Sequence, residues 1–134
     1  KGLQAEWYEF KGNKCADIPK APLNGTYPIE KVMIPEKAKG NIGLVIKGFI
    51  NVPKDDIYTF ALLSDDGSTL VIDGEQVIDN DGPHGPREVI GQKALSKGYH
   101  PIEVRYFDQN GGQLKMTVTG TEGNEIPASD LYAN

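Results

Sequence analysis

The sequence is short of cysteine, of arginine and of long apolar runs, and each shortage excludes a class of protein. One cysteine among 134 residues, Cys15, allows no internal disulfide and no cysteine-based metal framework. Only two of the 14 basic residues are arginines, so no bidentate phosphate-reading cluster is available. With a net charge of −5, we expect neither nucleic acid nor an anionic membrane surface as a partner. No apolar run reaches the 18 residues of a membrane-spanning helix.

The helical pattern of apolar residues is also missing from the chain. Short β-rich runs bounded by Gly, Pro, Asp and Asn recur in its place, at residues 3–10, 42–52, 57–64, 70–73, 76–79, 88–95, 99–107 and 113–119. Such closely spaced strands favour an all-β antiparallel sandwich or barrel over any α/β arrangement. At this length we expect a single domain that spans residues 1–134.

Two connections carry recognisable turn chemistry. Gly74-Glu75 separates two of the strand-like runs and predicts a tight hairpin of the Asp-Gly type. Residues 11–41 hold four prolines and six lysines, and we predict a long surface loop or covering segment there. Within that segment, Asn24-Gly25 indicates a turn.

Acidic residues gather in the middle of the chain. Residues 55–88 contain nine acids and one base, Arg87, while the rest of the chain carries a net charge of +3. The block includes Ser64-Asp65-Asp66-Gly67 and Asp79-Asn80-Asp81-Gly82, and clustered carboxylates with Asn side chains are the ligands that Ca²⁺ takes. The alternative is that these acids solvate turns and start them through side-chain hydrogen bonds.

The same block carries a family resemblance. The segments Val52-Pro53, Ile57-Tyr58-Thr59-Phe60, Ser64-Asp65-Asp66-Gly67 and Ile72-Asp73-Gly74, followed by Lys97-Gly98-Tyr99-His100-Pro101, resemble the PA-fourteen family. These β-sandwich modules are named after the protective antigen of a bacterial toxin, and the resemblance covers residues 3–132. It implies a two-sheet antiparallel β-sandwich of the kind appended to bacterial glycoside hydrolases, adhesins and toxins.

The resemblance also implies a set of site residues. In the sugar-binding adhesins of the family, two aspartates joined by a cis peptide hold a Ca²⁺ that ligates sugar hydroxyls, and Asp65 and Asp66 match them. A second calcium loop corresponds to Asp108, which stands where the family has Asn, with Asn110 close by. We therefore expect Asp65, Asp66, Asp108 and Asn110 as metal ligands. Ligand binding is expected at Asp65, Asp66, His84 and Arg87, the last two shaping the rim.

Other chemistries have less support. An EF-hand is excluded because Asp79-Asn80-Asp81-Gly82 has its Gly at the fourth position rather than the sixth. His84 is expected at an exposed loop tip, and His100, which precedes Pro101 in a strand-like run, is interpreted as structural. A zinc site from both histidines and Cys15 lacks the required spacing. No nucleophile elbow, phosphate loop or His-Glu-x-x-His is present, so we do not expect an enzyme.

Two hypotheses of function remain open. In the first, the chain is a non-catalytic carbohydrate-binding module of a secreted or surface bacterial glycoside hydrolase, with Ca²⁺ as its cofactor. In the second, it packs on a neighbouring catalytic domain and has no sugar affinity of its own. The chain starts without an initiator Met or a signal peptide, which suggests a module cut from a longer protein. We expect an extracellular, periplasmic or cell-surface location and a monomer.

Overall fold

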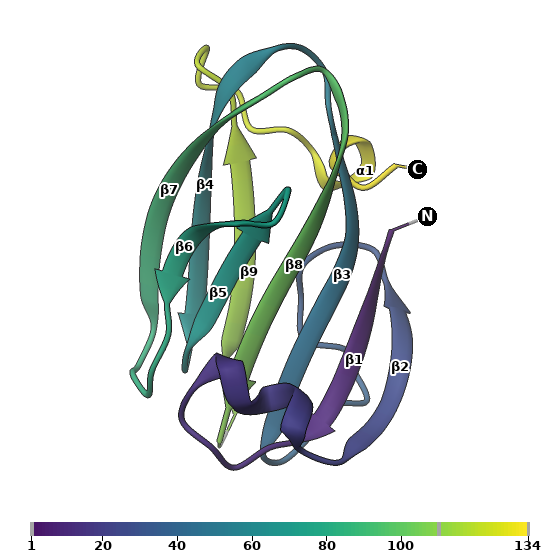
Figure 1. Ribbon diagram of the computed structural model, residues 1–134, viewed down its shortest axis with the longest axis vertical. Coiled ribbons are helices and arrows are strands. Elements are labelled where there is room, and N and C mark those ends of the chain that lie inside the picture. Colours follow the sequence, from purple (N-terminus) through teal and green to yellow (C-terminus); the bar gives the residue numbers. More distant parts are fainter. Residues whose placement is uncertain (1, 110, 134) are drawn as a thin grey trace.

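The structure is a computed structural model that describes residues 2–109 and 111–133. Within these residues it contains nine strands, a 3-10 helix and a short α-helix (Figure 1). In chain order they are β1 (Leu3–Glu9), η1 (Cys15–Lys20), β2 (Leu23–Ile29), β3 (Ile42–Val52), β4 (Asp56–Asp65), β5 (Ser68–Ile72), β6 (Glu75–Asn80), β7 (Arg87–Leu95), β8 (Gly98–Asp108), β9 (Gln113–Thr119) and α1 (Ala128–Leu131).

The strands form two sheets, and every pair of neighbours is antiparallel. The six-stranded sheet has the order β2-β1-β3-β8-β5-β6, and the three-stranded sheet has the order β7-β4-β9. The predicted two-sheet antiparallel β-sandwich is therefore confirmed. Among the described residues, no helix is long and apolar enough to cross a membrane.

The core lies between the two sheets and follows the alternation of strand side chains. Tyr58, Phe60 and Leu62 of β4 point inward and are at most 1% exposed. They pack in one cluster with inward residues of the larger sheet, such as Leu44 and Val104. Burial of each such side chain contributes about 1.5–3 kcal/mol, so this layer is the main source of stability.

The prediction for residues 11–41 is partly wrong. The segment contains η1 and β2, and Asn24-Gly25 lies within β2, where Gly25 pairs with Trp7, rather than in a turn. β2 is the edge strand of the larger sheet. Pro28, which has no main-chain N–H, is tolerated there because an edge strand makes hydrogen bonds to a neighbouring strand on one side only. The six-residue η1 is too short to show a helical period.

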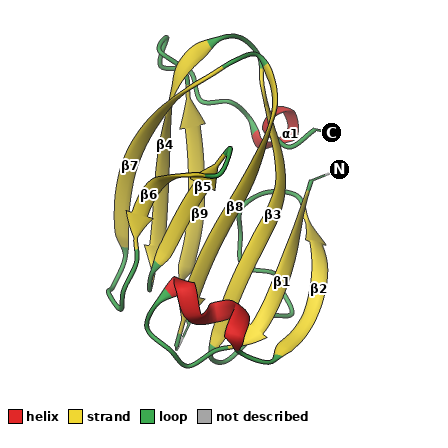
Figure 2. Cartoon of the chain, in the orientation of Figure 1, coloured by secondary structure: helices red, strands yellow, loops and turns green. Residues whose placement is uncertain are grey.

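The rest of that segment is the predicted cover. The larger sheet is wider than its partner, and residues 30–41 pack Val32, Met33, Ile34 and Ala38 into the main core cluster alongside Leu3 and Ala5 of β1. On the outer side, η1 covers one end of the larger sheet (Figure 2). It buries a second apolar cluster there, in which the Phe10 and Phe107 rings meet edge to face at 5.8 Å.

Two smaller features complete the architecture. The hairpin between β5 and β6 is confirmed, but its turn residues are Asp73 and Gly74, both with positive φ, rather than Gly74-Glu75. The two ends of the fold meet, because the Gly2 amide donates a hydrogen bond to the Tyr132 carbonyl over 3.1 Å. Figure 1 shows both ends of the chain on the same side of the sandwich.

Candidate functional site

The turn between β4 and β5 is the centre of the candidate site. The peptide bond between Asp65 and Asp66 is cis, as the family resemblance implied. The turn is attached to the far end of β8, because the Asp66 amide donates to the Phe107 carbonyl over 3.2 Å. The Phe107 amide returns a 3.0 Å hydrogen bond to the Gly67 carbonyl. The two aspartates therefore lie beside the end of β8 that carries Asp108.

The Asp66 carboxylate joins two further loops. Its Oδ1 accepts a 3.1 Å hydrogen bond from the His84 amide, in the loop between β6 and β7. Its Oδ2 accepts a longer bond of 3.4 Å from the Gln109 amide, just after β8. Three loops thus converge on this one side chain at the same end of the sandwich.

Tyr106 connects the turn to the buried part of β8. The Tyr106 hydroxyl donates a 2.6 Å hydrogen bond to the main-chain oxygen of Asp65. Burial raises the pKa of Tyr106 above its ordinary value, and the negative charges of Asp108, Asp65 and Asp66 raise that pKa further. The fields of three carboxylates thus act on one buried hydroxyl. Asp108 itself is only 3% exposed.

Close backbone approach at two glycines holds the loops together. A Cβ at Gly67 would lie 2.7 Å from the main-chain N and O of Gly82. A Cβ at Gly112 would collide with the Asp65 carbonyl and lie 2.6 Å from the Tyr106 hydroxyl oxygen. Both distances are too short for a side chain, so only glycine lets the three loops touch.

The loop after β6 is fixed by a buried amide. Asn80 is fully buried, and its Nδ2 lies 2.9 Å from the Arg87 carbonyl and 3.2 Å from both the Leu62 carbonyl and Ser64 Oγ. Arg87 Nε donates to Asn80 Oδ1 over 2.7 Å, and Arg87 Nη2 to the Asp81 carbonyl over 3.2 Å. These contacts tie the end of β6 to β4 and to the start of β7.

His84 is half-buried rather than at an exposed tip. Its ring nitrogens Nε2 and Nδ1 lie 2.8 Å from the Asn80 carbonyl and 2.6 Å from the Gly85 carbonyl. The expected exposure of this residue is therefore wrong, because main-chain oxygens of its own loop hold the ring.

The structure brings most of the predicted site residues together. Asp65, Asp66 and Asp108 lie at one end of the sandwich, with His84 in contact with Asp66. Arg87 lies next to this group through the Asn80 contacts, and its predicted rim role stays a prediction. Asn110, the fourth predicted metal ligand, falls outside the described residues.

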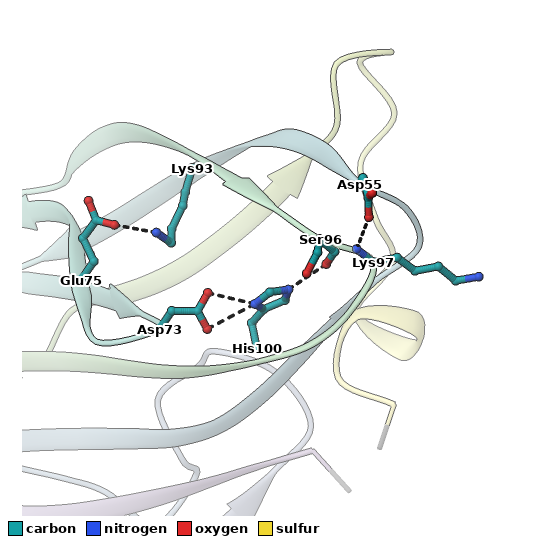
Figure 3. Close-up of polar contacts among 7 residues, drawn as sticks. All are labelled: Asp55, Asp73, Glu75, Lys93, Ser96, Lys97 and His100. Atoms are coloured by element: carbon teal, nitrogen blue, oxygen red, sulfur yellow. Dashed lines mark hydrogen bonds and ion pairs between the residues drawn. The ribbon is translucent and has the colours of Figure 1, made fainter.

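His100 lies at the opposite end of β8 (Figure 3). Its Nδ1 lies 2.9 Å from Asp73 Oδ2, and its Nε2 lies 2.7 Å from the Ser96 carbonyl. It therefore links the β5–β6 hairpin to the connection before β8, which agrees with the structural interpretation. In the part of the chain that the structure describes, no three His, Cys, Asp or Glu side chains form a group that could hold a metal ion.

Three residues of the site were missed from the sequence: Asn80, Tyr106 and Gln109. The alternation of β6 offered a signal for Asn80, since Ile78 faces inward and every second residue of a strand shares a face. A buried Asn must find hydrogen-bond partners, so its position in the alternation predicts a pinned loop. For Gln109, whose contact uses the main-chain amide, the sequence holds no corresponding signal.

Comparison with known proteins identifies the family. The profile of the PA14 domain matches residues 1–130. The chain belongs to the PA14 domain family. No curated protein sequence matches it.

Solved structures agree with this assignment at the level of the fold. The PA14 domain of the MpAFP antifreeze protein superposes with a TM-score of 0.80 at 17% identity, covering 97% of this chain and 89% of that one. A PA14 sugar-binding domain from an RTX adhesin gives 0.79 at 18% identity, covering 100% and 99%. A β-glucosidase from Kluyveromyces marxianus in complex with glucose gives 0.68 at 16% identity, covering 96% of this chain and 16% of the enzyme.

Proposed function

We propose that this PA14 domain is a carbohydrate-binding module that uses Ca²⁺ at the Asp65-Asp66 turn. The observation that carries the proposal is the position of the Asp65-Asp66 turn beside the end of β8 that carries Asp108, where the Asp66 amide donates to the Phe107 carbonyl over 3.2 Å. Carboxylates that lie close enough to repel one another are stabilised by a cation bound between them. The sugar-binding function of the RTX adhesin domain, which shares the fold, supports the same reading.

The chemistry of the donors fits calcium better than other metals. Asp65, Asp66 and Asp108 supply hard carboxylate oxygens, which Ca²⁺ prefers, and no His or Cys is needed. Calcium takes six to eight oxygen ligands, so main-chain carbonyls of the loop after β8 and the Asn110 side chain would complete the site. Bound Ca²⁺ would supply free coordination places for two neighbouring sugar hydroxyls. The main-chain amides of His84 and Gln109 orient the Asp66 carboxylate, and the fold keeps Asp108 away from water.

The second candidate function is a structural one. In the β-glucosidase the similar region makes up 16% of the chain, so PA14 folds do occur within much larger enzymes. In this reading the domain packs on a neighbouring catalytic domain, and the Asp65-Asp66 turn serves the fold alone. Under either reading we propose a non-catalytic, monomeric module of a secreted or surface bacterial glycoside hydrolase, located outside the cytoplasm.

The proposal is tested by thermal melts in EDTA and in added Ca²⁺, followed by a glycan array. At one hundred times its dissociation constant, one bound ion adds about 2.7 kcal/mol to the free energy of unfolding. For a domain of this size that is a rise in Tm of several degrees. We expect the rise in the native domain and in Glu88→Gln, a control in an exposed acid of the same segment.

The Asp66→Ala variant should lose both the rise in Tm and the glycan signal while its circular dichroism spectrum stays native. A flat melt for the native domain, with no calcium-dependent binding on the array, would reject the proposal. The structural function would then be the one to pursue, by deleting the module from its parent protein.

A further inference from the structure

We propose that Asn80 is the positioning residue for the Asp66 carboxylate, acting through His84, and that Arg87 locks Asn80 in place. This inference rests on the proposed function, because it explains how the carboxylate proposed to bind calcium is held. It gives His84 and Arg87 a different task from contact with the glycan: both shape the loop that aims Asp66.

The first step is the orientation of the Asn80 amide. An amide carries one acceptor and one two-proton donor, and the buried side chain has acceptors on one side, the carbonyls of Leu62 and Arg87. Arg87 Nε can only donate, so the oxygen of the amide must face it, at 2.7 Å. The side chain is therefore fixed in one orientation by partners from β4 and β7.

The second step connects Asn80 to Asp66. The Asn80 carbonyl lies 2.8 Å from His84 Nε2, so the main chain of the same residue also holds the imidazole ring. The ring keeps the His84 main chain beside the β4–β5 turn, where its amide donates to Asp66 Oδ1 over 3.1 Å. Asn80 thus contacts β4, β7 and the loop residue that orients the carboxylate.

The third step is the support from outside the loop. The carboxylate of Asp81 accepts the Cys15 amide at 3.0 and 3.3 Å, which attaches the loop to η1, while Arg87 Nη2 holds the Asp81 carbonyl. The loop is thus held at Asp81 by η1 and by Arg87. If Asn80 becomes mobile, the residue that moves with it is His84, because the Asn80 carbonyl holds the His84 ring. The Asp66 carboxylate would then sample several orientations, which lowers the affinity for an ion that binds to only one of them.

The test uses Asn80→Ser and Arg87→Gln, with Arg105→Gln as the matched control. Arg105 is the other arginine of the chain, and its guanidinium contacts Glu103 and the Cys15 carbonyl instead of the loop. Two quantities are measured in each folded variant. One is the hydrogen exchange of the His84 amide in metal-free protein, and the other is the affinity for Ca²⁺ alone by titration calorimetry.

We expect the His84 amide to exchange about tenfold faster in both loop variants, while core amides such as Phe60 keep their native protection. Calcium should bind about five- to tenfold more weakly. Arg87→Lys, which restores one donor to Asn80 Oδ1, should recover most of the loss. A merely structural role would lower protection throughout the fold and would not single out His84. Asn80→Ser removes buried hydrogen bonds and can prevent folding. If it does, Arg87→Gln provides the test, because Arg87 is exposed.

Unchanged His84 protection in folded Arg87→Gln would overturn the inference, as would unchanged calcium affinity in a protein that binds the ion. If the native domain binds no Ca²⁺, the proposed function fails, and the exchange of the His84 amide still decides whether Asn80 sets this loop.

Discussion

Tyr106 Oη lies 2.6 Å from the main-chain oxygen of Asp65, and this hydrogen bond joins the middle of the larger sheet to the turn of the candidate site. Tyr106 is fully buried near the end of β8. The contact makes the turn an extension of the core rather than a free surface loop.

The first prediction concerns this hydrogen bond. Tyr106→Phe keeps the ring in place and removes the hydroxyl, so the Asp65 carbonyl loses its donor. We expect the free energy of unfolding to fall by about 1–2 kcal/mol, measured by urea denaturation. The affinity for Ca²⁺ should also fall, since the turn loses a support. A variant with native calcium affinity would show that the hydroxyl matters for the fold alone.

The second prediction concerns the opposite end of β8. His100→Asn cannot reach both Asp73 and the Ser96 carbonyl, and we expect a loss of about 1–2 kcal/mol in urea denaturation. Asp73→Asn should remove part of the same interaction, so the losses of the two single variants should not add in the double variant. Because β8 separates His100 from Asp108 by about 25 Å, calcium affinity should stay native. A drop in that affinity would contradict this placement.

The third prediction concerns alkaline pH. Burial raises the pKa of Tyr106 and that of Tyr132 above the ordinary value near 10. The unfolded chain therefore ionises first, and the stabilisation from these groups is complete below pH 10 and is lost as the pH rises towards their folded pKa values. Urea midpoints between pH 8 and 11.5 should fall above pH 10, and less so in Tyr132→Phe. A flat profile across this range would contradict the burial.

The fourth prediction concerns Cys15. Burial raises the pKa of its thiol, and the hydrogen bond and negative charge of Asp81 raise that pKa further. Because the thiolate is the reactive form, the native protein should react slowly with a disulfide reagent and the urea-unfolded protein at once. Asp81→Ala should speed the reaction, since the Cys15 amide loses its carboxylate partner and η1 opens more often. Equal rates in the native domain and the variant would show that the loop does not hold η1.

The sequence predicted the parts of the fold that depend on alternation. The inward face of β4 and the half-exposed face of β9 follow from period-two patterns, because each strand has one face against the core. β2 was missed because Pro28 and the Asn24-Gly25 pair are typical of turns, and they are accepted here since the strand lies at an edge. Whether such a segment pairs with β1 depends on contacts far along the chain.

The sequence indicated the acidic residues of the candidate site but not the contacts that hold them. The Asp65-Asp66 pair stood out by its charge and by its family resemblance, and Asp108 by its place after a strand. The contacts that hold them could not be predicted, because the loops that meet at Asp66 lie 18 and 43 residues away along the chain. The contacts of His84 and Gln109 use main-chain amides, which almost every residue type has, so the residue types in the sequence do not reveal these contacts.

The hydrogen bond between Gly2 and Tyr132 has a consequence for the way such a module can be carried. A module in which Gly2 and Tyr132 are in contact can be inserted between two adjacent positions of a host's surface loop without stretching that loop. The candidate site lies at the other end of β3 and β8, directed away from that attachment. A host would therefore hold the module by one end and present the acidic turn at the other.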